Sequence, residues 1–187
     1  MHLKQPVIVT PRLELHHIPG DRMIDLFEKR DDTFALSGET FTNPLRNLID
    51  FQGPLAWRVP QVKADQEVNK WFVRWIVLKE SMEVIGSTSF HGAPDAQGMM
   101  EIGLGIENQY QNQGYAKEAL LGMWGWAVTF SEVKILRYTV DPANLPSIAV
   151  INYFGFKYIG QQLDEIDGPE DIYEMSSINF KQKWGSN

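Results

Sequence analysis

The stretch Met100–Phe130, MEIGLGIENQYQNQGYAKEALLGMWGWAVTF, contains the pattern that decides the fold. It begins as an apolar run, turns through a polar loop at Glu107–Gln113 and enters a long apolar segment at Gly114. A short apolar run followed by apolar residues at helical spacing predicts a strand, a loop and a helix. We expect the rest of the chain to support this unit and to supply its substrate.

The loop that ends at Gly114 has the features of an anion site. A helix N-terminus presents unpaired main-chain N–H groups and a partial positive charge, and glycine permits a tight turn and close approach by a ligand. These features favour a phosphate or pyrophosphate. The glycine spacing fits neither a P-loop nor a dinucleotide-binding motif. From spacing alone, an ordinary glycine-assisted loop is an equal alternative.

Composition bounds the class of protein. The 187 residues predict a single domain, 1–187, and 43% hydrophobic with 22% charged residues allow a normal packed core. The chain has no cysteine, which excludes disulfides, thiolate metal sites and a cysteine nucleophile. The net charge of −7 and the lack of a Lys/Arg cluster argue against a nucleic-acid partner. The four histidines form no metal-ligand pattern, so we expect no metal.

Targeting and membrane signals are not visible in the sequence. The apolar run near the N-terminus is broken by Pro6 and Pro11, unlike a signal peptide. The longest uncharged apolar run, Ala119–Phe130, is too short to span a membrane. We therefore expect a soluble, cytoplasmic protein with no membrane partner.

The predicted elements alternate in a way that indicates the fold class. Strands are expected at Leu13–Leu15, Trp71–Lys79, Val84–Phe90, Met100–Ile106, Ile135–Val140, Phe156–Gly160 and Ile172–Phe180. Helices are expected from Asp21 to Arg30, at Pro60–Val68, after Gly114 and after Asn144. Short helices and loops fill Asp31–Trp57, and an acidic loop covers Asp164–Asp171. The order predicts an α/β protein with a central, mixed but mostly antiparallel sheet and helices on both faces.

Four motifs in the expected order resemble one family. Gln111–Ala116 matches the signature Q/R-x-x-G-x-G/A, and Glu101–Ile106 resembles the strand that precedes it. Thr10–Leu15 resembles an opening strand, and Asn144-x-x-Ser147 followed by Phe154–Phe156 resembles a second cofactor segment. The chain thus resembles the GCN5-related N-acetyltransferase (GNAT) superfamily, in its RimJ/RimL-like ribosomal-protein branch. The resemblance implies the acyl-CoA N-acyltransferase fold, acetyl-CoA as cosubstrate and direct transfer to an amine.

The same resemblance assigns residues to the cosubstrate. The main chain at Leu104 and Ile106 would pair with the pantetheine arm as an added strand. Asn144 would reach the cosubstrate from the following helix. The pyrophosphate would be held by the loop residues Gln111, Asn112, Gln113, Gly114, Tyr115 and Ala116.

Acetyl transfer needs a neutral amine and a protonated leaving group. Glu101 is the candidate general base, and the alternative is a strand-edge carboxylate that pairs with solvent or a nearby cation. Ile151 occupies the position where many members of the family have a tyrosine acid. Ser147 is the candidate substitute, and the alternative is a first-turn serine that bonds the main chain. Tyr153 is out of phase and is expected to pack.

The acceptor is the least defined part of the prediction. Trp57 could line an amine pocket, and His91 could contact the substrate, although a surface role for His91 is the alternative. The residues that choose between a protein N-terminus and a small amine are expected in Asp31–Trp57 and Asp164–Asp171. Two other functions stay open: a non-catalytic CoA-binding or sensing module, and a generic anion-binding domain. The oligomeric state, a homodimer included, is also open.

Overall fold

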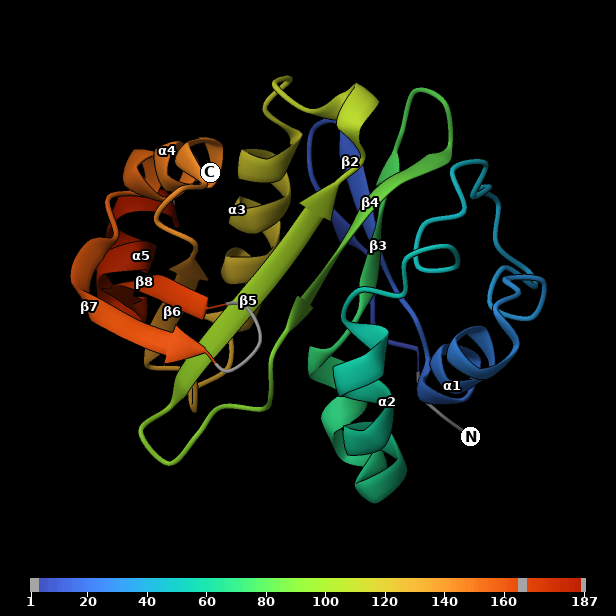
Figure 1. Ribbon diagram of the computed structural model, residues 1–187, viewed down its shortest axis with the longest axis horizontal. Coiled ribbons are helices and arrows are strands. Elements are labelled where there is room, and N and C mark those ends of the chain that lie inside the picture. The colour runs from blue at the N-terminus through green and yellow to red at the C-terminus, as the bar shows by residue number, and fades with distance from the viewer. Residues whose placement is uncertain (1–3, 165–167, 186–187) are drawn as a thin grey trace. The chain divides into compact units, whose positions relative to one another are not determined.

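The computed structural model describes residues 4–164 and 168–185. Its strands are β1 (Ile8–Val9), β2 (Leu13–His17), β3 (Arg74–Leu78), β4 (Glu83–Phe90), β5 (Met99–Ile106), β6 (Ile135–Val140), β7 (Lys157–Asp164) and β8 (Gly168–Ser176). Its helices are α1 (Gly20–Lys29), α2 (Leu55–Ala64), α3 (Tyr115–Ala127), α4 (Leu145–Phe154) and α5 (Ser177–Trp184), with 3-10 turns η1 (Gln66–Trp71) and η2 (Asn108–Tyr110) (Figure 1).

The strands form a mixed sheet, as the sequence predicts. The strand order is β1-β2-β3-β4-β5-β6-β8-β7. The pairs β1–β2, β2–β3, β3–β4, β6–β8 and β7–β8 are antiparallel, whereas β5 and β6 are parallel. The chain divides into two compact units, the first with residues 4–93 and 103–122 and the second with 94–102, 123–164 and 168–185. Each unit is described below by itself.

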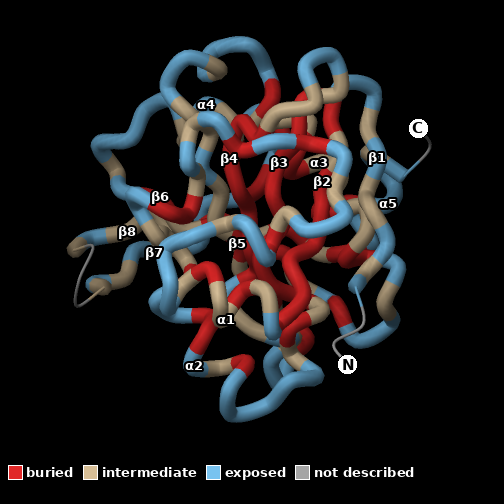
Figure 2. Tube along the Cα trace, turned by 90° about the vertical axis from the view of Figure 1, so that its right-hand side faces the viewer, coloured by how far each residue is buried: buried red, intermediate tan, exposed pale blue. Residues whose placement is uncertain are grey.

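The first unit is built on the buried strands β2, β3 and β4. Figure 2 shows these strands as mostly buried along the trace, and every residue of β3 is buried. Helices α1 and α2 lie side by side in Figure 1, joined by residues 30–54, which form turns and one isolated bridge between Thr42 and Glu83. Helix α3 packs close to β1 and β2 at Gly122, since a Cβ there would lie 3.3 Å from Ile8 Cγ2 and 3.4 Å from Leu15 Cδ1. This close approach accounts for a glycine that the helix would otherwise disfavour.

The second unit has an aromatic core centred on Trp124, which is fully buried. Its ring centroid lies 5.0 Å from that of Phe154, 4.6 Å from that of Phe156 and 6.0 Å from that of Phe180. Helices α4 and α5 lie together in Figure 1, and Lys183 Nζ of α5 donates to the main-chain oxygen of Phe154 in α4 over 3.0 Å. Trp124 is therefore a core residue rather than part of a ligand cage.

Helix α2 differs from its prediction. It begins at Leu55 rather than at Pro60, so Pro60 lies inside the helix, where its ring is exposed. The sequence pattern placed proline in the first turn because an interior proline removes a main-chain hydrogen bond at a cost of about 3 kcal/mol. Here Pro54 precedes the first turn instead. The predicted helix also ends early, and Asp65 caps the separate turn η1 by accepting from the N–H of Glu67 over 3.0 Å.

The C-terminal prediction is wrong in two places. The strands run further into the predicted acidic loop than expected, because β7 reaches Asp164 and β8 begins at Gly168. Residues 165–167 of that loop lie outside the described part. The last predicted strand ends at Ser176, whose Oγ accepts from the N–H of Asn179 over 3.2 Å and caps α5. Serine is a strong helix start signal, but the apolar residues around it masked that signal in the sequence.

The described parts of the chain contain neither a membrane-spanning helix nor a group of side chains that could hold a metal ion. Within residues 4–164 and 168–185, no helix has both the length and the apolar character that crossing a membrane requires. In the same ranges, no group of three or more histidine, aspartate or glutamate side chains is placed to hold a metal ion.

Candidate functional site

The loop between β5 and α3 adopts a tight conformation that its sequence permits. Asn112 has φ of 60° and Gly114 has φ of 82°, both in the left-handed region, and α3 starts at the next residue, Tyr115. Asparagine and glycine are the residues that enter this region most easily. The strand, loop and helix predicted from Met100–Phe130 are confirmed.

Side-chain amides hold this loop in shape. Gln111 Nε2 donates to the Ile106 oxygen over 2.8 Å and to Asn108 Oδ1 over 3.1 Å, and Gln113 Nε2 donates to the Gln109 oxygen over 3.1 Å. In the described ranges, the main-chain N–H groups of residues 112–116 have no acceptor. Five successive free donors where a helix begins form an arrangement suited to an anion with several oxygens.

Arg12 clamps this loop from the segment before β2. Its Nη1 donates to the Gln113 oxygen over 3.0 Å, its Nε donates to Glu118 Oε2 over 2.7 Å, and its guanidinium lies 4.4 Å from the ring centroid of Tyr115. Burial alone would raise the pKa of Glu118, but hydrogen bonds from Thr10 and Arg12 outweigh it and hold the pKa below its ordinary value. Glu118 therefore stays ionised and keeps Arg12 in place. The sequence prediction did not assign Arg12 a role, although it lies within the Thr10–Leu15 motif.

Trp57 and His91, the predicted substrate residues, lie in the first unit and share a neighbour. Gln61 Nε2 donates to the Trp57 oxygen over 3.1 Å and to the His91 oxygen over 3.4 Å. The Trp57 side chain is 54% exposed on α2. The His91 ring lies against β5, because a Cβ on Gly103 would be 3.0 Å from His91 Nε2. Gln61 thus links the main chain of these two residues, and the His91 ring lies beside β5.

Leu104 and Ile106 occupy the second half of β5 and are partly buried. The ladder between β5 and β6 ends at the pair Glu101–Arg137, so Leu104 and Ile106 lie outside it. At the edge of β5 opposite β6, Thr88 Oγ1 of β4 donates to the Gly103 oxygen over 2.9 Å. The pairing of a ligand with this part of β5 stays a prediction.

Glu101, the candidate base, lies in the second unit at the start of β5. It is partly buried, and its Oε1 accepts from Thr139 Oγ1 over 2.6 Å. Its cross-strand neighbour Arg137 is paired with another carboxylate, because Arg137 Nε donates to Glu174 Oε1 over 2.8 Å. Glu101 is thus oriented by a hydroxyl from β6.

Ser147, the candidate acid, lies in the first turn of α4. Asn144 caps this helix, since its Oδ1 accepts from the Ser147 N–H over 3.1 Å. The Ser147 hydroxyl lies 2.7 Å from the hydroxyl of Tyr138 on β6. The alternative of a serine bonded to the main chain is therefore not what the structure shows. Tyr153 packs against Trp184, with ring centroids 5.4 Å apart, as expected.

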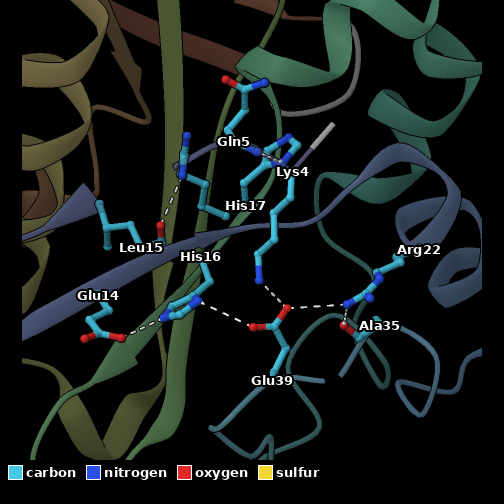
Figure 3. A network of polar contacts seen from close by, with 10 residues as sticks. Lys4, Gln5, Glu14, Leu15, His16, His17, Arg22, Ala35 and Glu39 are labelled. Atoms are coloured by element: carbon cyan, nitrogen blue, oxygen red, sulfur yellow. Dashed lines mark hydrogen bonds and ion pairs between the residues drawn. The ribbon is translucent and has the colours of Figure 1, made fainter. Parts of the chain in front are cut away.

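A second polar cluster lies on β2, apart from the predicted site residues. Figure 3 shows His16 and His17 on opposite sides of the strand, as their adjacency predicts. His16 Nε2 lies 2.8 Å from Glu14 Oε2, and Glu39 joins Arg22 and Lys4 to the same cluster (Figure 3). Because Glu39 belongs to residues 30–54, these ion pairs fasten that irregular segment to β2 and α1.

The predicted site residues are thus divided between the two units. Trp57, His91, Leu104, Ile106 and Gln111–Ala116 belong to the first unit, whereas Glu101, Asn144 and Ser147 belong to the second. Two functional candidates were missed, Arg12 and Tyr138. Arg12 contacts a residue 101 positions away, and the contact of Tyr138 with Ser147 depends on how α4 packs on β6, so no local pattern could have assigned either residue.

Comparison with known sequences identifies the class of protein. A family profile described as an acetyltransferase (GNAT) domain matches residues 29–157, more than half of the 187-residue chain. The chain therefore belongs to the GNAT acetyltransferase family, as the motifs predicted.

Two curated proteins match about half of this chain. The chain is 33% identical over 88 residues to the uncharacterized N-acetyltransferase YjdG of Bacillus subtilis (strain 168), covering 46% of this chain and 52% of YjdG. It spans about half the length of the two curated relatives it matches.

Two solved structures share the fold. The ribosomal-protein-S5-alanine acetyltransferase from Vibrio fischeri aligns with a TM-score of 0.64 and 16% identity, covering 95% of this chain and all of that one. RimL, a ribosomal L7/L12 α-N-protein acetyltransferase in complex with coenzyme A, aligns with a TM-score of 0.62 and 14% identity, covering 91% and 98%. At these identities the likeness shows the fold, and the RimJ/RimL-like branch stays a prediction.

Proposed function

We propose that this protein transfers an acetyl group from acetyl-CoA to a primary amine. The observation that carries the proposal is the row of free main-chain N–H groups at residues 112–116, at the start of α3, in a chain of the GNAT family. These donors suit the pyrophosphate of CoA. Arg12 supports the same loop through its hydrogen bond to the Gln113 oxygen, while its charge is paired with Glu118.

The chemistry is assigned to three side chains. Glu101 takes the proton from the acceptor ammonium, so that the neutral amine can attack the thioester carbon. Ser147 gives a proton to the leaving sulfur, and Asn144 contacts the cosubstrate from the same helix start. The single-domain prediction stays a proposal, and β5 and α3 each contribute residues to both units.

The acceptor is proposed to be a peptide N-terminus or a small amine. The ribosomal-protein acetyltransferases that share the fold favour a protein or peptide. An α-amino group, with a free pKa of about 8, needs less help from a base than a lysine does. Trp57 and His91 are the proposed acceptor contacts, because the His91 ring lies against β5, Gln61 bonds the main chain of both residues, and Trp57 is exposed.

CoA binding is tested by thermal unfolding. Free CoA at about 100 times its Kd should stabilise the protein by about 2.7 kcal/mol, which raises Tm by roughly 5–11 °C for a chain of this size. Gly114→Ala should reduce this shift, because φ of 82° strains an L-residue at the start of α3. Gly38→Ala is the matched control, with φ of 79° and open space around it. If CoA gives no shift with wild-type protein, both the transferase and the CoA-binding alternative are wrong.

Transfer is tested by thiol release from acetyl-CoA with a panel of N-terminal peptides, polyamines and amino acids. The chain has no cysteine, so the thiol reagent reports CoA alone. Acceptor-dependent release supports the transferase. CoA binding without release in the presence of any amine supports instead a non-catalytic CoA-binding module.

A further inference from the structure

A tyrosine on the neighbouring strand contacts the candidate acid. The hydroxyls of Tyr138 on β6 and Ser147 on α4 are 2.7 Å apart. Tyr138 is 7% exposed, and the edge of its ring contacts Trp124, with centroids 6.4 Å apart. In the described ranges, Tyr138 is the hydrogen-bond partner of the Ser147 hydroxyl. The two groups therefore form an isolated pair at the start of α4.

The direction of this hydrogen bond follows from acidity. A phenol, with an ordinary pKa near 10, is a far stronger acid than an aliphatic alcohol, so Tyr138 donates and Ser147 Oγ accepts. Burial raises the pKa of Tyr138, and this outweighs the opposite effect of the Ser147 bond. Tyr138 therefore keeps its proton at neutral pH and remains a donor.

Donation from Tyr138 fixes what Ser147 can do. Asn144 Oδ1 already holds the Ser147 main-chain N–H, which sets the position of the residue. With one Oγ lone pair occupied by Tyr138, the Ser147 proton must point to another group. A hydrogen bond received at the oxygen also makes the Ser147 O–H a better donor, because hydrogen bonds in a chain polarise one another.

We infer that Tyr138 is a positioning residue that holds Ser147 as the proton donor for the leaving thiolate. This inference rests on the proposed function. As the amine nitrogen forms its bond to the carbonyl carbon, the carbon–sulfur bond breaks and its electron pair passes to sulfur. The sulfur takes the Ser147 proton while Ser147 Oγ takes a proton from water in the same step, so no free alkoxide forms beside the Tyr138 hydroxyl. Tyr138 keeps its own proton throughout, and the proton of the acceptor ammonium leaves through Glu101.

Steady-state kinetics of four proteins test the coupling of the pair. Tyr138→Phe keeps the ring and removes the hydroxyl, so kcat should fall about 5- to 10-fold, the effect of one lost hydrogen bond, with an unchanged Kd for CoA by calorimetry. Ser147→Ala should lower kcat about 100-fold. The double variant should be no slower than Ser147→Ala, since Tyr138 acts only through Ser147. Tyr173 on β8 is the cross-strand partner of Tyr138. Tyr173→Phe is therefore the matched control and should keep the wild-type kcat.

Two kinetic results would overturn the inference. Wild-type kcat in Tyr138→Phe would show that the hydroxyl has no role in transfer. A Tyr138→Phe effect of equal size in the wild-type and Ser147→Ala backgrounds would show that it acts independently of Ser147.

A spectroscopic measurement tests the bond without turnover. In protein carrying ¹³Cζ-tyrosine, the Tyr138 resonance at neutral pH should move on Ser147→Ala, while that of Tyr173 should stay in place. An unmoved Tyr138 resonance would overturn the inference, even if Tyr138→Phe fails to fold. If wild-type protein transfers acetyl to no amine, the proposed function fails by itself, and a moved resonance would still show the bond.

Discussion

His17 makes the stability of the first unit depend on pH. Its ring is 2% exposed, Nε2 lies 2.9 Å from the Asn69 oxygen, and Nδ1 accepts from the Gln5 N–H over 3.2 Å. These partners fix a neutral ring with the proton on Nε2, because a proton on Nδ1 would face the Gln5 N–H. Burial lowers the pKa of His17 from 6.5 to about 4, with further lowering by Arg74 and Lys4 and an opposing effect of the bond to Asn69.

The size and sign of the effect follow from linkage. The unfolded chain binds a proton at His17 below pH 6.5, whereas the folded chain does not until about pH 4. The contribution of the neutral His17 to the free energy of unfolding is therefore fully present above pH 6.5. It falls as the pH is lowered from 6.5 to about 4. At 1.36 kcal/mol per pH unit, the full loss is about 3 kcal/mol, of which about 2 kcal/mol is lost by pH 5.

Urea unfolding at pH 8 and pH 5 measures this loss. With a slope of about 2 kcal/mol per molar urea, His17 alone should lower the midpoint by about 1 M between the two pH values. His17→Gln should be less stable at pH 8, because it loses the fitted ring, but its midpoint should change less between pH 8 and pH 5. His91→Gln removes an exposed imidazole and controls for the loss of a histidine as such.

One result would refute this reasoning. If His17→Gln and the wild type lost the same free energy of unfolding between pH 8 and pH 5, the buried neutral ring would not be the source of the acid sensitivity. A larger loss in His17→Gln than in the wild type would contradict it equally.

Three further predictions follow from the site and from α3. Glu101→Gln should lower kcat for acetyl transfer roughly 100-fold and leave the Kd for CoA unchanged by calorimetry. Arg12→Ala should raise the Kd for CoA roughly 10-fold, because the loop loses the charge-assisted hydrogen bond from Arg12 Nη1 to the Gln113 oxygen. Arg46→Ala, which breaks an exposed ion pair, should leave the Kd unchanged. Gly125→Ala should raise the free energy of unfolding by about 1 kcal/mol, because a Cβ at this position meets nothing within 4 Å. Gly122→Ala should give no such gain, because a Cβ there meets side chains of β1 and β2.

Each of these predictions has a distinct contrary outcome. Equal kcat for Glu101→Gln and wild type would remove Glu101 as the base. A lower or unchanged Kd for Arg12→Ala would show that the loop keeps its shape without the hydrogen bond from Arg12. Equal midpoints in urea for the two glycine variants would show that close packing does not decide the choice of residue in α3.

Local chemistry in the sequence predicted the strand, loop and helix around Gly114. A helix start, a residue with positive φ and an apolar period each depend on neighbours within a few positions. The cap at Asn144 and the helix stop at Gly155, which has φ of 80°, were predicted for the same reason. The fold class followed from the order of such units.

Contacts between distant residues were not predictable in this way. Arg12 lies 101 positions from Gln113, and its place on the loop depends on how β2 and α3 pack. Tyr138 and Ser147 are only nine positions apart, but their contact depends on how α4 folds back on β6. The predicted start of α2 was wrong because Pro54, just before the helix, and Pro60, inside it, each suit a helix start, and only packing selects between them.

The irregular segment between α1 and α2 shares its supports with the proposed cosubstrate loop. Asn47 Nδ2 donates to Glu107 Oε1 over 2.7 Å, and Glu107, whose N–H donates to the Ile85 oxygen over 2.9 Å, is the residue from which the loop departs. Thr42 bonds the main chain at both Met82 and Val84, so the same segment is also held at the start of β4. If this segment selects the acceptor, as its irregular sequence suggests, then the same hydrogen bonds hold both the acceptor-selecting segment and the loop that binds the acetyl donor. Changes of acceptor preference in this segment should therefore be accompanied by changes in CoA affinity, because Glu107 cannot shift without moving the loop.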